Sequence, residues 1–233
     1  MKPDRLKKMI FAVVLGGCAS FGVVATADAE FIGNIQGGTD FPQGAISFAD
    51  QVIDYSPGMV GGNPSEPHRG AFNALGLPNY VGVNSCASQA SCSFVSLGDG
   101  GSITLKFTDN LLTGSGNNQN DLWIFEVGPD IEDTFVEISH DGVNWSSVGR
   151  VFGTTAGVDI DFYGFGVSDQ FAYVRLTDDT NEGGQTGITV GADIDAVGAI
   201  STVAIPEPET YAMLMAGLGL LGFVARRSKQ QAA

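Results

Sequence analysis

Polar and apolar residues alternate in short runs through the central part of the chain, and glycine-rich turns separate these runs. No long segment between residues 30 and 203 shows the 3.6-residue period of an amphipathic helix. Alternation with a period of two predicts strands with one buried face and one face in water. The clearest predicted strands are 102–107, 121–127, 134–139, 146–150, 171–177 and 194–200.

Strands of this length and spacing predict an all-β fold, an antiparallel β-sandwich of jelly-roll type. Turn sequences such as Asp141-Gly142 separate the strands. Residues 30–95 contain many Pro and Gly breaks, so we expect long loops there with one or two strands on the same sandwich. The predicted domain spans residues 30–203, between an N-terminal signal helix and a C-terminal hydrophobic helix.

Residues 1–29 have the organisation of a secretory signal peptide, with a basic start followed by an apolar run. Ala27 and Ala29 supply the small residues that a signal peptidase needs, so Glu30 would begin the mature chain. Cys18 leaves an alternative, in which a lipoprotein signal is cleaved before a lipid-modified Cys18. Because the apolar run continues past Cys18, we favour cleavage after Ala29.

Three features follow one another near the C-terminus, between about residues 204 and 229. Pro206-Glu207-Pro208 is stiff and extended because each proline fixes its own φ. An uncharged apolar run, predicted to be a helix over 211–225, precedes Arg226-Arg227. The run is shorter than the roughly 20 residues of a usual membrane span. It would hold the chain transiently in the inner membrane, with its basic end in the cytoplasm.

These three features resemble the PEP-CTERM sorting signal, with Ile205 where that family usually has Val. The resemblance implies processing by an exosortase, a membrane protease. It also implies a Gram-negative bacterium that makes exopolysaccharide, and a protein that is delivered to the cell surface or the extracellular matrix.

The formal net charge is −15, and only four of the eleven basic residues lie outside the two ends of the chain. A domain with so few basic residues has no patch to neutralise phosphates, so we expect no nucleic-acid partner. Such a domain attracts cations, although negative charge also serves simply to keep a surface protein in solution.

Two acidic segments are candidates for a calcium site. Asp178 and Asp179 lie in a polar loop, and Asp193 and Asp195 share one face of a predicted strand. Calcium prefers several hard oxygen ligands, and paired carboxylates repel one another unless a cation lies between them. We expect a structural Ca²⁺ to join the two segments; the alternative is that each acid caps a turn or faces solvent.

Cys86 and Cys92 lie close together in a Ser-rich segment without a neighbouring histidine, a pattern that does not suit zinc. In an oxidising compartment they would form a disulfide. His68 and His140, the two histidines, are expected to be exposed turn residues.

A second resemblance lies in the segment from Val136 to Trp145, which contains Ser139 and Asp141-Gly142, followed by Tyr173-Val174-Arg175-Leu176. This hairpin and strand resemble the galactose-binding-like, discoidin-type sandwich. Such sandwiches often bind sugars, but the fold alone does not establish the ligand.

No catalytic constellation stands out, so we expect a non-enzymatic surface or matrix protein that associates with extracellular polysaccharide. Two alternatives remain: a secreted polysaccharide hydrolase, and a structural or adhesive module that calcium makes rigid. Flat aromatic rings would contact the sugar. We expect Trp123 and Trp145 to pack in the core; the other candidates are Tyr55, Tyr80 and Tyr163, the last within a possible exposed aromatic loop, 162–166.

Overall fold

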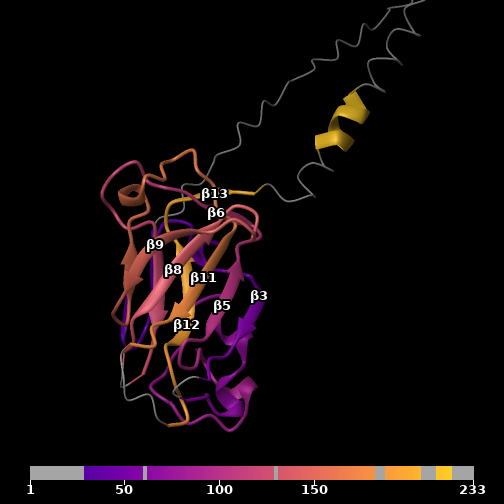
Figure 1. The fold of residues 1–233 in the computed structure, drawn as a ribbon. Helices are drawn as coiled ribbons and strands as arrows, with labels where there is room; N and C mark the ends of the chain where they lie inside the picture. The colour runs from indigo at the N-terminus through magenta and orange to yellow at the C-terminus, as the bar shows by residue number, and fades with distance from the viewer. Residues whose placement is uncertain (1–28, 60–61, 129–130, 182–186, 206–213, 222–233) are drawn as a thin grey trace, which may run out of the picture.

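The computed structural model describes residues 29–59, 62–128, 131–181, 187–205 and 214–221. The main body consists of two antiparallel sheets that pack face to face (Figure 1). This arrangement confirms the predicted all-β sandwich.

The larger sheet has five strands. Their order is β3 (Gln51–Ser56), β5 (Ser102–Lys106), β11 (Tyr173–Asp178), β8 (Thr134–Ser139) and β9 (Ser146–Val151). Each adjacent pair is antiparallel, so β3 and β9 form the edges of this sheet.

The smaller sheet has four strands. Their order is β10 (Ala156–Val158), β7 (Leu122–Glu126), β12 (Asp193–Ala199) and β4 (Val95–Ser96). A β-bulge interrupts β12 between Ile194 and Ala196. Because β10 is an edge strand and lies beside β9, the open sides of the two sheets meet at these strands.

Two further strand pairs and several short helices complete the described fold. The pairs are β1 (Glu30–Asn34) with β2 (Gly37–Phe41), and β6 (Asn110–Leu112) with β13 (Thr202–Ala204). The 3₁₀ helices are η1 (Gly44–Ser47), η2 (Glu66–His68), η3 (Ala71–Ala74), η4 (Gln89–Ser91) and η5 (Asp161–Tyr163). Residues 214–221 are α-helical.

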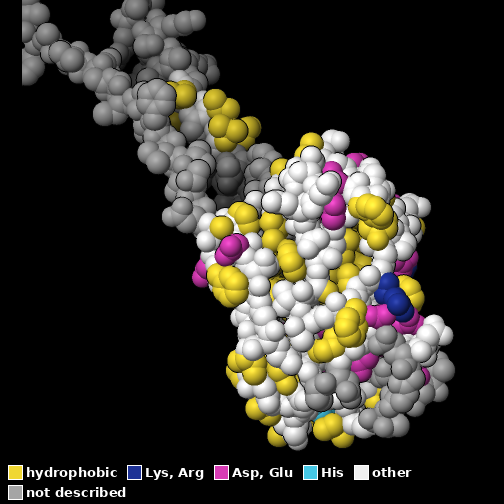
Figure 2. Space-filling model, turned by 90° about the vertical axis from the view of Figure 1, so that its left-hand side faces the viewer, with side chains coloured by type: hydrophobic (Ala, Val, Ile, Leu, Met, Phe, Trp, Pro, Cys, Tyr) yellow, Lys and Arg dark blue, Asp and Glu magenta, His cyan; other side chains and the backbone are white. Residues whose placement is uncertain are grey.

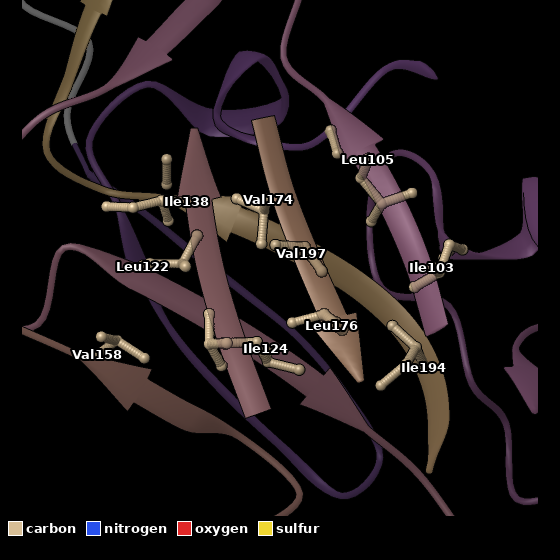
Figure 3. Packing of buried hydrophobic residues seen from close by; sticks show 14 of the residues in the cluster. Ile103, Leu105, Leu122, Ile124, Ile138, Val158, Val174, Leu176, Ile194 and Val197 are labelled. Atoms are coloured by element: carbon tan, nitrogen blue, oxygen red, sulfur yellow. The ribbon is translucent and has the colours of Figure 1, made fainter. Parts of the chain in front are cut away.

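The main core fills the space between the sheets. Ile103 and Leu105 of β5 and Leu176 of β11 face Ile124 and Val197 of the smaller sheet (Figure 3). All five are almost completely buried. Burying a side chain of this size contributes about 1.5–3 kcal/mol, so this layer provides much of the stability of the sandwich.

A second, aromatic cluster covers the outer face of the smaller sheet. Phe125 follows Ile124 in β7 and therefore points away from the main core. The rings of Phe41 and Phe48 lie about 6 Å from the Phe125 ring, with centroid distances of 6.1 and 6.0 Å. The N-terminal strand pair is thus fixed to the sandwich by its own apolar residues.

All six strands that the alternation predicts are present, with ends that differ by no more than two residues. Residues 30–95 contain more strands than the one or two expected: β1, β2, β3 and the start of β4 lie there. The three-residue strands β6, β10 and β13 were not predicted, because a run of three residues is too short to reveal an alternating pattern.

Candidate functional site

A cavity of about 330 Å³ opens between the edge strands of the two sheets. Val148, Arg150 and Val151 of β9 line it, together with Gly157 and Val158 of β10. The two valines nearest the core supply an apolar floor, since Val148 and Val158 are buried. The cavity therefore lies at the open side of the sandwich, where β9 and β10 are the edge strands of the two sheets.

Polar and aromatic side chains from two loops border the same cavity. Asn118 and Asn120 belong to the loop between β6 and β7, and Asp159 follows β10. Phe162 and Tyr163 belong to η5; their rings meet edge to face, with centroids 5.2 Å apart. Phe162 is 81% exposed, which is unusual for a phenylalanine and leaves a free ring face at the cavity.

Two glycines allow two of these side chains to approach the strands. Gly149 has φ of +96°, and a Cβ at this position would lie 2.1 Å from the Tyr163 hydroxyl oxygen. A Cβ at Gly157 would lie 2.1 Å from Asn120 Nδ2. Any larger residue at either position would displace the aromatic or the amide side chain, so both glycines shape the cavity.

Arg150 links the cavity to the next loops of the larger sheet. Its Nη1 atom lies 2.7 Å from Asp133 Oδ2 and 2.6 Å from Asp179 Oδ2. The backbone amide of Asn181, followed by Arg150, lowers the pKa of Asp179. Asp179, one of the four predicted calcium ligands, thus stays ionised and holds a cationic side chain of the protein.

The other three predicted calcium ligands have donors of their own. Asp178 accepts hydrogen bonds from the amides of Ala192 (2.7 Å) and Gly100 (3.0 Å). Asp193 accepts one from the Ser96 hydroxyl. The donors to Asp195 are the Asn34 side chain and the backbone amides of Asn79 and Tyr80.

Asp193 and Asp195 therefore lie in different surroundings despite their spacing of two residues. The β-bulge between Ile194 and Ala196 interrupts the alternation there. Burial raises the pKa of Asp195, and burial raises that of Asp193 well above its usual range. The charges of Glu132 and Asp178 also raise the pKa of Asp193, which places these three acids in one electrostatic neighbourhood.

Glu126, at the end of β7, belongs to this neighbourhood but was not among the predicted ligands. It is 2% exposed; Oε1 accepts the Glu132 amide at 3.0 Å, and no described residue bonds to Oε2. Burial raises the pKa of Glu126 to about 10, and Glu132 and Asp193 also raise it. In the sequence, Glu126 is a single glutamate at the end of an apolar run. A glutamate exposed at the end of a strand would look the same, so the sequence does not indicate its burial.

Several predicted side-chain positions need correction. Trp145 lies outside the core: the Arg175 guanidinium stacks on its ring at 4.3 Å and pairs with Glu137 at 2.6 Å. Trp123 is partly buried and packs against the aromatic cluster on the outer face. His68 is buried, and its ring nitrogens are satisfied by the Ser65 hydroxyl and a backbone carbonyl, whereas His140 is exposed.

The remaining candidate aromatics do not form one surface. Tyr55 is half-buried and donates a hydrogen bond to the Ser96 carbonyl, and Tyr80 is buried. Tyr163 alone among the candidates lines the cavity. A disulfide joins Cys86 to Cys92, whose Cα atoms lie 5.2 Å apart, and supports the cluster of Tyr80 and Phe94.

On the face shown in Figure 2, acidic side chains lie at several places, and basic side chains form one small patch beside an acidic one. Hydrophobic side chains are scattered over the same face. This distribution agrees with the strongly acidic composition.

Residues 204–228 match the family model described as the PEP-CTERM protein-sorting motif. The chain carries a PEP-CTERM sorting signal. The signal indicates an exported, surface-directed protein that an exosortase sorts. Its residues Pro206, Glu207, Pro208, Arg226 and Arg227 lie outside the described part of the structure, as does Ala27, whereas Ala29 is exposed just before β1.

No helix within the described residues has the length and apolar character needed to cross a membrane. Residues 214–221 are helical, and the rest of the predicted helix 211–225 lies outside the described ranges.

A solved structure with a detectable likeness is the C-terminal domain of a chitobiase from Bacteroides fragilis. The likeness covers 45% of this chain and 64% of the chitobiase chain, less than two thirds, at 17% identity and a TM-score of 0.30. No curated protein sequence matches the chain as a relative.

Proposed function

We propose that the sandwich of this exported protein binds an extracellular polysaccharide in the cavity between β9 and β10, and that it does not cleave the polysaccharide. The observation that carries the proposal is the exposed Phe162 and Tyr163 pair beside a cavity lined by amide and charged groups. Sugar-binding sites need both kinds of group.

Aromatic rings offer a flat apolar surface to the C–H face of a sugar ring. The amides of Asn118 and Asn120 both donate and accept hydrogen bonds, as sugar hydroxyls do. Asp159 accepts hydrogen bonds and Arg150 donates them. A volume of about 330 Å³ lies at the lower end of the range for small-ligand sites, which suits a short stretch of a chain rather than a buried whole ligand.

The charge of the protein favours a neutral or amino-sugar polysaccharide over a uronic-acid polymer. With a formal net charge of −15, the chain repels polyanions at long range. Arg150 offers little compensation, since its guanidinium already pairs with Asp133 and Asp179.

The composition of the cavity supports binding without hydrolysis. Glycoside hydrolases of the usual kind place two carboxyl groups on either side of the scissile bond. Among the residues that line this cavity, Asp159 carries the sole carboxylate.

The test is a glycan array of neutral, amino-sugar and uronic-acid polysaccharide fragments, probed with the purified full-length chain. We expect binding to at least one neutral or amino-sugar fragment, lost at least tenfold in the variant Phe162→Ala with Tyr163→Ala. Phe72→Ala is the matched control, because Phe72 is also exposed but does not line the cavity. Equal binding by the double variant, or release of reducing ends from the fragments, would overturn the proposal.

We also propose a structural calcium ion beside Glu126 and Asp193, a revision of the predicted ligand set; among the described residues, no third His, Cys, Asp or Glu joins these two in a group whose ligand atoms lie within 4.8 Å of one another. The buried Oε2 atom of Glu126 without a partner supports this, because neighbouring acids would otherwise need protons. Thermal unfolding with Ca²⁺ and with EDTA tests it: Glu126→Gln should have a smaller calcium-dependent shift in melting temperature than the unchanged protein. Asp54→Asn, an exposed site on β3, should keep the shift.

A further inference from the structure

Asp121 precedes β7 at the opposite end of this strand from Glu126, and it is completely buried. Its Oδ2 atom accepts a hydrogen bond of 2.9 Å from the Ile160 amide. Its Oδ1 atom is equally buried, and no described residue meets the geometry of a hydrogen bond to it, although the hydroxyls of Ser115 and Ser201 lie close enough to lower the pKa of Asp121. Burying a carboxylate oxygen without a hydrogen-bond donor costs folding free energy, and such atoms in native proteins often contact an ion or a water molecule.

Two further carboxylates converge on Asp121. One oxygen each from Asp121, Asp159 and Asp161 lies within 4.8 Å of the other two. The backbone fixes the latter two acids: Asp159 accepts a hydrogen bond from the Phe162 amide at 3.3 Å. Asp161 accepts hydrogen bonds from two backbone amides of the loop before β7, those of Ser115 at 2.8 Å and Gly116 at 3.0 Å.

Three carboxylates this close repel one another, and the repulsion is screened least at Asp121, which is buried, whereas Asp159 and Asp161 are partly exposed. Burial raises the pKa of Asp121, and the charge of Asp161 adds to the rise, while the hydroxyls of Ser201 and Ser115 and the Ile160 amide oppose it. Arg150 lines the adjoining cavity, but its guanidinium is held by Asp133 and Asp179.

We propose that Asp121, Asp159 and Asp161 bind a calcium ion. Calcium–oxygen bonds are about 2.3–2.6 Å long, so oxygens on opposite sides of the ion are about 4.6–5.2 Å apart. Mutual separations within 4.8 Å therefore allow all three carboxylates to reach one calcium ion. Mg²⁺ suits the site less well, because it demands near-ideal octahedral geometry and keeps several waters, whereas Ca²⁺ accepts an irregular set of oxygens. The hydroxyls of Ser115 and Ser201 offer neutral oxygens beside the carboxylates, and water would complete the shell.

The ion would tie together two segments that are distant in sequence. Ser115 and Asp121 lie in the loop between β6 and β7, whereas Asp159 follows β10 and Asp161 begins η5. Both segments border the cavity, so calcium would also order the loops that carry Asn120 and Phe162. The site itself does not depend on whether the cavity binds a polysaccharide.

The other group of three ligand-type residues within such a distance, among those described, is His68 with Cys86 and Cys92. The two cysteines form a disulfide and therefore offer no thiolate to a metal.

Isothermal titration of calcium chloride into the purified, chelator-stripped full-length chain tests the inference. The titration is made in Glu126→Gln protein, so that calcium bound beside Glu126 does not contribute. We expect this variant to bind calcium more tightly than magnesium, and to lose at least tenfold in calcium affinity when Asp121→Asn is added. Asp54→Asn added in its place should leave the affinity unchanged.

Asp161→Asn provides a second test if the Asp121 variant fails to fold, because Asp161 is only partly buried. It should weaken calcium binding at least tenfold as well. No calcium binding to the Glu126→Gln protein would overturn the inference, and so would unchanged binding after either aspartate is replaced. Failure of the calcium titration would leave the polysaccharide proposal standing, because the glycan array measures polysaccharide binding by a separate readout.

Discussion

The Ile160 amide donates to Asp121 Oδ2 over 2.9 Å, while the other oxygen of the same buried carboxylate has no described donor. The backbone therefore fixes one oxygen of the carboxylate, and the other oxygen lies beside the hydroxyls of Ser115 and Ser201 without a well-formed hydrogen bond. A cation site benefits from this arrangement, because the carboxylate is already held in position.

Asp121→Asn is accordingly expected to stabilise the metal-free protein. The asparagine oxygen would keep the Ile160 hydrogen bond, and its NH₂ group would face Asp159 and Asp161 in place of a third negative charge. We expect a gain on the order of 1 kcal/mol, or about 2–4 °C in melting temperature, in EDTA at pH 7. Thermal unfolding followed by circular dichroism measures it; a lower melting temperature in EDTA would contradict this account of Asp121.

Gly149→Ala is expected to disturb the cavity through Tyr163. The added methyl group would lie 2.1 Å from the Tyr163 hydroxyl, so the ring of Tyr163 must move. Overpacking of this kind costs about 1–3 kcal/mol. We expect a lower melting temperature and a loss of glycan binding, measured by calorimetry and on the array.

Gly153→Ala is the matched control for this change. Gly153 also has a positive φ, +127°, but a Cβ there would have no neighbour within 4 Å. The control should lose stability through backbone strain alone and keep its glycan affinity. If both variants keep their affinity, the position of Tyr163 is irrelevant to binding.

The alternation of residues predicted the central strands well, because each has a face in the main core. Ile103 and Leu105 of β5 show this directly. The same signal is absent from β10, whose three residues owe their conformation to pairing with β7. Propensity and periodicity are local, whereas such pairing is tertiary.

The site was harder to predict for a related reason. Asp178 and Asp193 were singled out from local acidic segments, but Glu126 and Glu132 come from other parts of the chain. Asp121 meets Asp161 only because β10 pairs with β7. The burial of His68 likewise depends on Ser65 and on a distant carbonyl, so its Pro-rich surroundings gave no indication of it.

The raised pKa of Glu126 makes the stability of the metal-free protein depend on pH. Below about pH 4.5 both folded and unfolded chains carry the proton on Glu126; above it the unfolded chain releases the proton, while the folded chain keeps it up to about pH 10. Stability in EDTA should therefore fall as pH rises through this window, by at most about 1.4 kcal/mol per pH unit.

Melting temperatures in EDTA from pH 5 to 9 check this dependence. Glu126→Gln should make the fall with pH less steep, because glutamine stays neutral, while the raised pKa values of Asp193 and Asp195 maintain part of the slope. Glu66→Gln at an exposed position should leave the curve as in the unchanged protein. Calcium should stabilise the protein more at pH 8 than at pH 5, since it replaces the proton. If the melting temperature of the unchanged protein in EDTA rose with pH, and that of Glu126→Gln did not, the raised pKa assigned to Glu126 would be contradicted.

Replacing Pro206-Glu207-Pro208 with three alanines should block sorting of the precursor. The motif at residues 204–228 indicates exosortase processing. We expect the variant to accumulate with its C-terminal segment still attached, detectable by mass spectrometry and cell fractionation. Lys substitutions at Arg226 and Arg227 keep the positive charge and separate charge from specific recognition. An unchanged mature mass and location after the alanine replacement would show that the motif is not used.

Polysaccharide binding is measured most directly by NMR. The uniformly labelled full-length chain is titrated with the array fragment that binds best, and amide chemical shifts are followed. The account predicts that the largest changes fall on Asn118, Asn120, Phe162 and Tyr163 and on the facing edges of β9 and β10. Changes concentrated on another surface, or none at saturating fragment, would contradict the claim that this cavity holds the polysaccharide.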